Sequence, residues 1–175
     1  MRFVITGEWS RNRLLQTIVV LYSLYVALLW VSNALLYFHK MSLDPASVVL
    51  YYLGDEETFR SPRTYQGLLE ISHFHLFAMG MLLLVLTHLM LFVPLANRVK
   101  AWLIVLPFAA ALLDEGSGWL VRFVHPGFAV AKVAGFLLLQ GSLAALVGAS
   151  LWAVFAGAQR HYSAQSASDP PADSR

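Results

Sequence analysis

The sequence predicts an all-α membrane protein, a single bundle of four transmembrane helices. Hydrophobic residues make up 58% of the chain and charged residues only 13%, and the mean hydropathy of +0.63 is far above that of a soluble domain. Four apolar segments each reach the roughly 20 residues that a helix needs to cross about 30 Å of hydrocarbon. These segments cover residues 14–38, 68–95, 101–124 and 127–157.

The four segments leave little of the chain for other structure. We therefore expect one membrane domain over residues 1–160, with an outer loop at residues 41–65 as its main part outside the membrane. Residues 161–175 are rich in Ser, Ala, Asp and Pro, a composition that predicts a disordered tail.

The placement of basic residues predicts the topology. Lys and Arg flank the spans on one side of the membrane, at Arg2, Arg11, Arg13, Arg98, Lys100 and Arg160. Because positively charged connections stay in the cytoplasm, we expect a bacterial inner-membrane protein with both termini inside. The bias is modest, since the outer loop and its borders also carry Lys40, Arg60 and Arg63.

Missing residue types and motifs exclude several chemistries. The chain has no cysteine, so it can hold no disulfide, no Cys-ligated iron–sulfur cluster and no c-type haem. Any metal or cofactor must be held by His, Met or carboxylate side chains. The chain also lacks a phosphate-binding loop, a G-x-S-x-G or H-E-x-x-H motif, and a basic aromatic surface for nucleic acid.

The first span and the outer loop contain few polar features. Ser32 and Asn33 lie in the outer part of the span, and polar side chains at that depth are expected to face protein rather than lipid. In the loop, Asp44 followed by Pro45 predicts the start of a short surface helix, because Asp caps a helix and Pro suits its first turn. Such a loop could cap the bundle or dock a partner subunit.

The second span carries three histidines, His73, His75 and His88. Ionisable side chains at membrane depth are costly, so they are functional candidates by default. Residues two apart on a helix point in nearly opposite directions, so at most one of His73 and His75 faces a given partner. Gly80 shares the side of His73 and leaves room for a flat group or for a neighbouring backbone.

The third and fourth spans add charges at a similar depth. Asp114 and Glu115 lie about 13 residues beyond the inner surface, roughly 20 Å along a helix. Pro107 predicts a kinked or interrupted helix before them. The fourth span begins near His125, and Lys132 follows seven residues later on about the same face.

Counted from the outer surface, these polar groups converge. The outer third of the bundle should contain His39, Glu70, His73, His75, Asp114, Glu115, Arg122, His125 and Lys132. His88 falls in the inner half and would belong to a wider proton or charge network. A one-sided cluster drawn from all four spans is more informative than any single member.

One hypothesis for this cluster is a b-type haem. Its axial ligands would be His73 or His75 opposite His125, with His39 as a further candidate, and Arg122 and Lys132 would meet the propionates. No second span carries paired histidines, so one haem is expected rather than two.

Three other hypotheses could explain the cluster. Glu70, Asp114, Glu115 and His73 could exchange protons with a bound quinone. A divalent metal, zinc or copper, could bind to His73, His75, His125 and His39. Alternatively, Arg122 and Lys132 only neutralise the carboxylates, and the protein is a cofactor-free scaffold or assembly subunit.

The segments at residues 72–80 (SHFHLFAMG) and 87–88, together with the four spans, resemble small bacterial four-helix inner-membrane proteins. In a general way they also resemble the four-helix b-type cytochromes of respiratory complexes. The resemblance implies electron transfer with a quinone or a periplasmic redox partner, and His73, His75 and His125 as ligand candidates. We therefore expect a subunit of a larger redox assembly rather than an enzyme acting alone.

Overall fold

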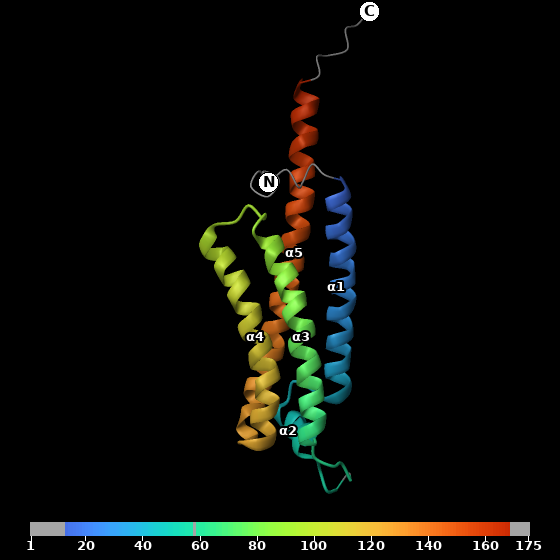
Figure 1. Cartoon of the computed structure of the whole chain (residues 1–175), viewed down its shortest axis with the longest axis vertical. Coiled ribbons are helices and arrows are strands. Elements are labelled where there is room, and N and C mark those ends of the chain that lie inside the picture. The colour runs from blue at the N-terminus through green and yellow to red at the C-terminus, as the bar shows by residue number, and fades with distance from the viewer. Residues whose placement is uncertain (1–12, 58, 169–175) are drawn as a thin grey trace, which may run out of the picture.

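The computed structural model describes residues 13–57 and 59–168, with side chains up to residue 155, and these residues form helices joined by short connections. Four helices are long and apolar enough to cross a membrane. In chain order the long helices are α1 (Arg13–Lys40), α3 (Tyr65–Met90), α4 (Asn97–Phe123) and α5 (Ala129–Ser168). The predicted four-helix membrane fold is confirmed (Figure 1).

The helix ends differ most from the predicted spans at the end of α3 and at the end of α5. The second span ends at Met90 rather than at residue 95, because a turn leads into Pro94, which disfavours helix in the residue before it. The last helix continues to Ser168, so residues 161–168 of the expected disordered tail are helical. The rest of that tail and the N-terminal Arg2 and Arg11 lie outside the described residues.

The third span is one continuous helix. Pro107 is buried within α4 and does not interrupt it, so of the two predicted forms, a kinked or an interrupted helix, the interrupted one is wrong. A proline inside a helix removes one backbone hydrogen bond and is tolerated in membranes where neighbouring helices cover the site.

Two apolar clusters hold the bundle together. The larger one joins all four long helices through residues such as Val26, Leu83, Ala110 and Leu146. The smaller one lies at the end of the bundle where the outer loop is found, and its centre is the stack of Tyr37 on Phe136, with ring centroids 3.7 Å apart.

The short helix α2 (Pro45–Leu53) closes this end of the bundle, as Figure 1 shows. The side chain of Asp44 accepts a hydrogen bond from the backbone N–H of Ala46, which confirms the predicted cap. Tyr52 of α2 packs directly on Gly118 of α4, where a β-carbon would lie only 2.6 Å from the tyrosine hydroxyl oxygen. A glycine at this position therefore lets α2 sit on the bundle.

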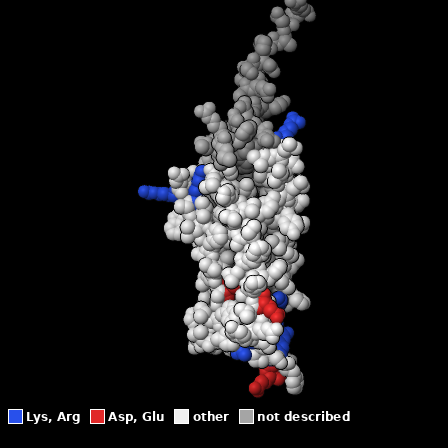
Figure 2. All heavy atoms as spheres, viewed as in Figure 1, with Lys and Arg blue, Asp and Glu red and all other residues white. Residues whose placement is uncertain are grey.

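The surface is that of a membrane protein. On the face shown in Figure 2, Lys and Arg lie near both ends of the bundle, and the flank between them is almost free of charge. A short 3-10 helix, η2 (Pro126–Phe128), joins α4 to α5 at the end covered by α2.

Candidate functional site

The centre of the site is a hydrogen-bonded group between α3 and α4. His75 Nδ1 lies 3.0 Å from Oε2 of Glu115, and Ser72 donates a hydrogen bond to the other carboxylate oxygen. Trp119 in turn donates to the Ser72 hydroxyl at 2.7 Å. Both carboxylate oxygens of Glu115 are therefore engaged.

This arrangement fixes the imidazole in a useful orientation. When Glu115 is ionised, Nδ1 of His75 carries the proton that points at the carboxylate, and Nε2 is left to face another molecule. A histidine supported by a carboxylate in this way can accept a proton at Nε2 or donate one from it. The pair thus has the chemistry of a proton-exchange group, with the carboxylate more buried than the half-exposed imidazole.

A second charged pair lies beside the first. The ammonium of Lys132 on α5 is 2.9 Å from Oδ1 of Asp114 on α4, and it donates a hydrogen bond to the Asp114 carbonyl oxygen at 2.9 Å. The Oδ1 contact is an ion pair without hydrogen-bond geometry, since that oxygen has no hydrogen-bond partner among the described residues.

Gly135 makes this second pair possible. It lies three residues after Lys132, on the same face of α5, and a β-carbon there would be 2.7 Å from the backbone nitrogen of Asp114. The backbones of α4 and α5 therefore approach closely at the level of the ion pair.

His75, Glu115 and Asp114 line a pocket of about 160 Å³. All four long helices contribute to it, and its polar end is formed by Asn33, His75, Asp114 and Glu115. The rest of the wall is apolar and consists of Leu76, Met79, Gly80, Leu83, Phe108, Ala111, Leu112 and Leu139.

The wall of the pocket reaches the outer surface of α3 and α4. The pocket is partly open, and two of its lining residues, Leu76 and Leu112, are largely exposed on the outside of the bundle. A β-carbon at Gly80 would meet no other atom within 4 Å, so this glycine leaves space in the pocket and does not serve close helix packing. Gly80 borders the same pocket as His75, although it lies seven residues after His73, a spacing that predicts a shared helix face with His73.

A smaller cavity of about 80 Å³ adjoins the pocket on the side of α2. It shares Asn33, His75, Asp114 and Glu115 with the pocket and continues past Tyr52 to Lys40. Burial raises the pKa of the Tyr52 hydroxyl, so this group stays neutral. The polar end of the pocket is thereby linked to the end of the bundle covered by α2.

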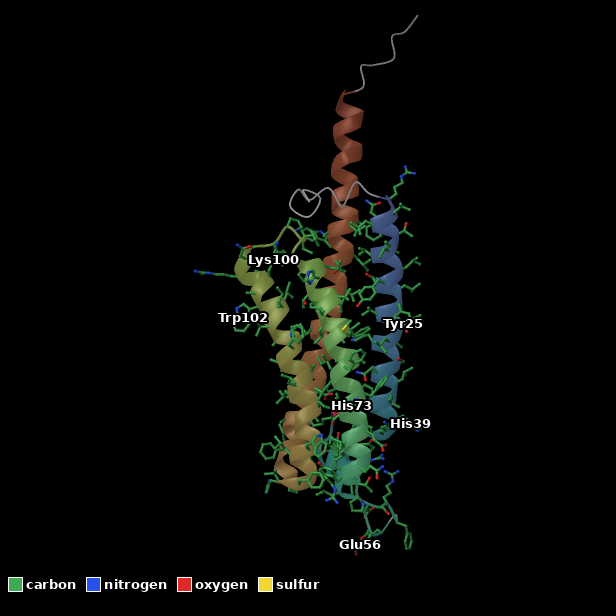
Figure 3. All side chains as sticks on the ribbon, in the orientation of Figure 1. Tyr25, His39, Glu56, His73, Lys100 and Trp102 are labelled. Atoms are coloured by element: carbon green, nitrogen blue, oxygen red, sulfur yellow. The ribbon has the colours of Figure 1, made fainter. Side chains whose placement is uncertain are left out.

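The other histidines expected in the cluster lie apart from this site. His73 is exposed on the surface of α3, and His39 is exposed near the end of α1 (Figure 3). His125 caps the turn η2, where its Nδ1 accepts a hydrogen bond from the Gly127 backbone. None of the three lines the pocket, and among the described residues no group of three or more His and carboxylate side chains could hold a metal ion.

The remaining candidates also have other partners or positions. Glu70 is exposed and accepts a hydrogen bond from Gln66. His88 is exposed near the opposite end of α3. Arg122 donates to the Arg63 carbonyl oxygen at 2.7 Å instead of facing the carboxylates.

Sequence reasoning missed two members of the site. Ser72 lies three residues before His75, and Trp119 lies four residues after Glu115, so each shares a helix face with one member of the His75–Glu115 pair, while its hydrogen bond crosses to the other helix. That spacing could have identified both. Of the two polar residues expected to face protein, Asn33 does line the pocket, whereas Ser32 is exposed and bonds back to the Leu29 carbonyl oxygen.

Comparison with protein families agrees with this architecture. The model of the Aq_1264_TM family, described as a transmembrane helical domain, matches residues 42–161. Comparison with curated proteins and with solved structures finds no match. Because the matched residues make up more than half of the chain, the protein belongs to the Aq_1264_TM family.

Proposed function

We propose that this member of the Aq_1264_TM family binds the head group of a lipid-soluble quinone, and that its His75–Glu115 pair exchanges a proton with that head group. The observation that carries the proposal is the pocket itself, which is partly open beside exposed leucines of α3 and α4 and has the hydrogen-bonded His75–Glu115 pair at its polar end. We further propose that the protein serves a larger redox assembly in the bacterial inner membrane.

The size of the pocket favours a single ring. A cavity of about 150 Å³ in another protein holds benzene, and the pocket here measures about 160 Å³. A quinone head group is one six-membered ring or two fused rings, and its isoprenoid tail can leave through the opening between α3 and α4. A porphyrin is several times larger than such a ring.

The distribution of polar groups favours a head group with a carbonyl oxygen. The amide of Asn33 can donate a hydrogen bond at the polar end, as can Nε2 of His75 once the imidazole is protonated, and Phe108 and the aliphatic side chains can cover the ring faces. Oxidation of a quinol to a quinone releases two protons and two electrons. Neutral His75, supported by Glu115, can accept one proton at Nε2, and the second would leave through the adjoining cavity. The electrons would pass to a partner subunit.

The adjoining cavity supports an outward proton route. It extends from Glu115 and Asp114 toward Lys40, which ends α1. We propose that this end of the bundle faces the outside, with both termini in the cytoplasm, because Arg13, Arg98 and Lys100 lie at the opposite end.

The haem hypothesis and the purely structural hypothesis have less support. A b-type haem in this pocket would find one histidine, His75, among the lining residues, so it would lack a second axial imidazole from the protein. A structural role suits the Lys132–Asp114 pair, whose two side chains neutralise each other.

The test uses Gly80→Leu, which places a side chain in the pocket without striking another described atom at its β-carbon. Gly148→Leu is the matched control, because Gly148 also lies in open space but outside the pocket. Binding of a short-tailed quinone to the detergent-purified protein is measured by equilibrium dialysis. We expect at least about tenfold weaker binding in Gly80→Leu, a smaller loss in His75→Ala, and an unchanged affinity in Gly148→Leu.

Two results would overturn the proposal: a wild-type protein that binds no quinone, or equal affinity in the wild type and Gly80→Leu. An absorption spectrum of the same samples, oxidised and then reduced with dithionite, distinguishes bound haem from bound quinone. Sharp α and β bands that disappear in His75→Ala would establish haem in place of quinone.

A further inference from the structure

A separate cavity of about 330 Å³ lies at the surface beside the end of α1, and we call it the basic pocket. Its lining comes from α1, from α2 and from the loop that follows α2, and consists of His39, Lys40, Leu50, Tyr51, Arg60, Ser61 and Arg63. Four of these residues are basic or can be protonated, and none is acidic. Figure 3 shows His39 at this end of α1, at the same end of the molecule as the loop.

The loop holds its two arginines in place through the backbone. Asp55 and Arg60 exchange two backbone hydrogen bonds of 2.9 Å, and Arg63 donates its backbone N–H to the Tyr52 carbonyl oxygen at 3.0 Å. The loop starts at Gly54, whose φ of +80° and close approach to the Arg60 carbonyl oxygen exclude a β-carbon. The basic pocket is therefore formed by an ordered backbone.

Two of the cationic side chains lie over one aromatic ring. The guanidinium of Arg63 lies 4.0 Å from the centre of the Tyr51 ring, and the ammonium of Lys40 lies 5.9 Å from the same centre. Within the described residues, the side chains of Lys40, Arg60 and Arg63 form no ion pair with a carboxylate. Positive charges held close together repel one another, and an anion between them would remove that repulsion.

The pocket also lies where an anionic head group would be found. The helix α1 crosses the membrane and ends at Lys40, which lines the pocket. Leu50 in the pocket wall is 44% exposed, and Phe59 on the adjoining loop is 95% exposed, so this surface presents apolar side chains to its surroundings. Basic and apolar groups together are typical of a surface that lies at the level of lipid head groups.

We propose that the basic pocket binds a phosphate group, either that of an anionic lipid head group or that of free phosphate. Guanidinium groups such as those of Arg60 and Arg63 match two phosphate oxygens at once, and Lys40 adds a point charge. No residue of the basic pocket lines the pocket beside His75 and Glu115, although Lys40 and Tyr51 also line the smaller cavity that adjoins it. Arg60 and Arg63 line neither of those two cavities, so changing them tests the basic pocket alone.

The experiment uses the full chain in neutral detergent. Native mass spectrometry measures the binding of phosphatidylglycerol and of phosphatidylcholine with the same acyl chains, and inorganic phosphate is added as a competitor. The test variant is Arg60→Gln/Arg63→Gln, and Arg13→Gln/Arg98→Gln removes two exposed arginines near the opposite end as the matched control. Arg60→Lys/Arg63→Lys keeps the charge and checks that the loop still folds.

We expect the wild type to prefer phosphatidylglycerol. Each basic residue near a membrane surface contributes about a fivefold gain in affinity for anionic lipid, so Arg60→Gln/Arg63→Gln should bind about thirtyfold more weakly. The control should be unchanged, and the Lys variant should retain most of the affinity. Phosphatidylglycerol binding that resists inorganic phosphate identifies a lipid site, and displacement by inorganic phosphate identifies a free-phosphate site. Equal phosphatidylglycerol affinity in the wild type and Arg60→Gln/Arg63→Gln would overturn the proposal.

Discussion

Replacing Lys132 with Met should strongly destabilise the bundle, because it leaves the Asp114 carboxylate without its neutralising charge. The side chains of the pair are only 9% and 19% exposed, so neither group is well hydrated. Removing one partner of a buried ion pair costs about 3–5 kcal/mol. Lys132→Met should therefore lower the free energy of unfolding by an amount in that range.

A double-mutant cycle isolates the contribution of the ion pair. Asp114→Asn removes the carboxylate, and Lys132→Met/Asp114→Asn removes both charges, so no unpaired charge remains. The double variant should be more stable than the sum of the two single losses predicts, by about 1–3 kcal/mol. Reversible unfolding in mixed detergent micelles with increasing dodecyl sulfate, followed by circular dichroism, measures all four proteins.

Lys100→Met supplies the control. The Lys100 ammonium donates a hydrogen bond to the Leu91 carbonyl oxygen at 3.0 Å, and no carboxylate ion pair of Lys100 is seen among the described residues. This variant removes a comparable backbone contact without exposing a buried charge. Equal losses in Lys100→Met and Lys132→Met, or additive losses in the cycle, would refute the reasoning.

Three further changes test the packing around the site. Gly135→Ala should lower the free energy of unfolding by about 1–3 kcal/mol, because its β-carbon would strike the Asp114 backbone, and the same micelle assay measures it. Gly54→Ala should destabilise the loop by about 1 kcal/mol or more, seen as faster protease cleavage there, because φ is +80° and the Arg60 carbonyl oxygen is close. Because burial raises the pKa of Tyr52, the folded protein keeps that proton longer than the unfolded chain, so stability should fall above about pH 10 in wild type and less steeply in Tyr52→Phe.

The fold was predictable because membrane-spanning helices follow directly from hydropathy. A run of about 20 apolar residues has few alternatives in lipid, since every backbone group must be hydrogen-bonded within the segment. The ends of the helices were harder to place. Met90 ends α3 although apolar residues continue, and the helix α5 reaches Ser168 although the composition turns polar.

The site was predictable in depth but not in its partners. Counting depth from the outer surface grouped His75, Asp114, Glu115 and Lys132 at one level, and in the structure His75 pairs with Glu115 and Lys132 with Asp114. Depth alone could not exclude His73, because a residue two positions away lies at nearly the same depth but on another face of the helix.

Helix faces decide which polar groups at one depth can meet, and an isolated sequence leaves those faces unassigned. On α3, Ser72 and His75 are three residues apart, and on α4, Glu115 and Trp119 are four apart, so each pair presents two polar groups on one side. These two pairs match each other across the α3–α4 contact. His73 also has a polar neighbour three residues away, Glu70, but both side chains are exposed, and Glu70 accepts a hydrogen bond from Gln66 on the same helix. Spacing within a helix therefore identifies the candidate faces, and it is the contact between α3 and α4 that places the face of His75, not that of His73, against a carboxylate of another span.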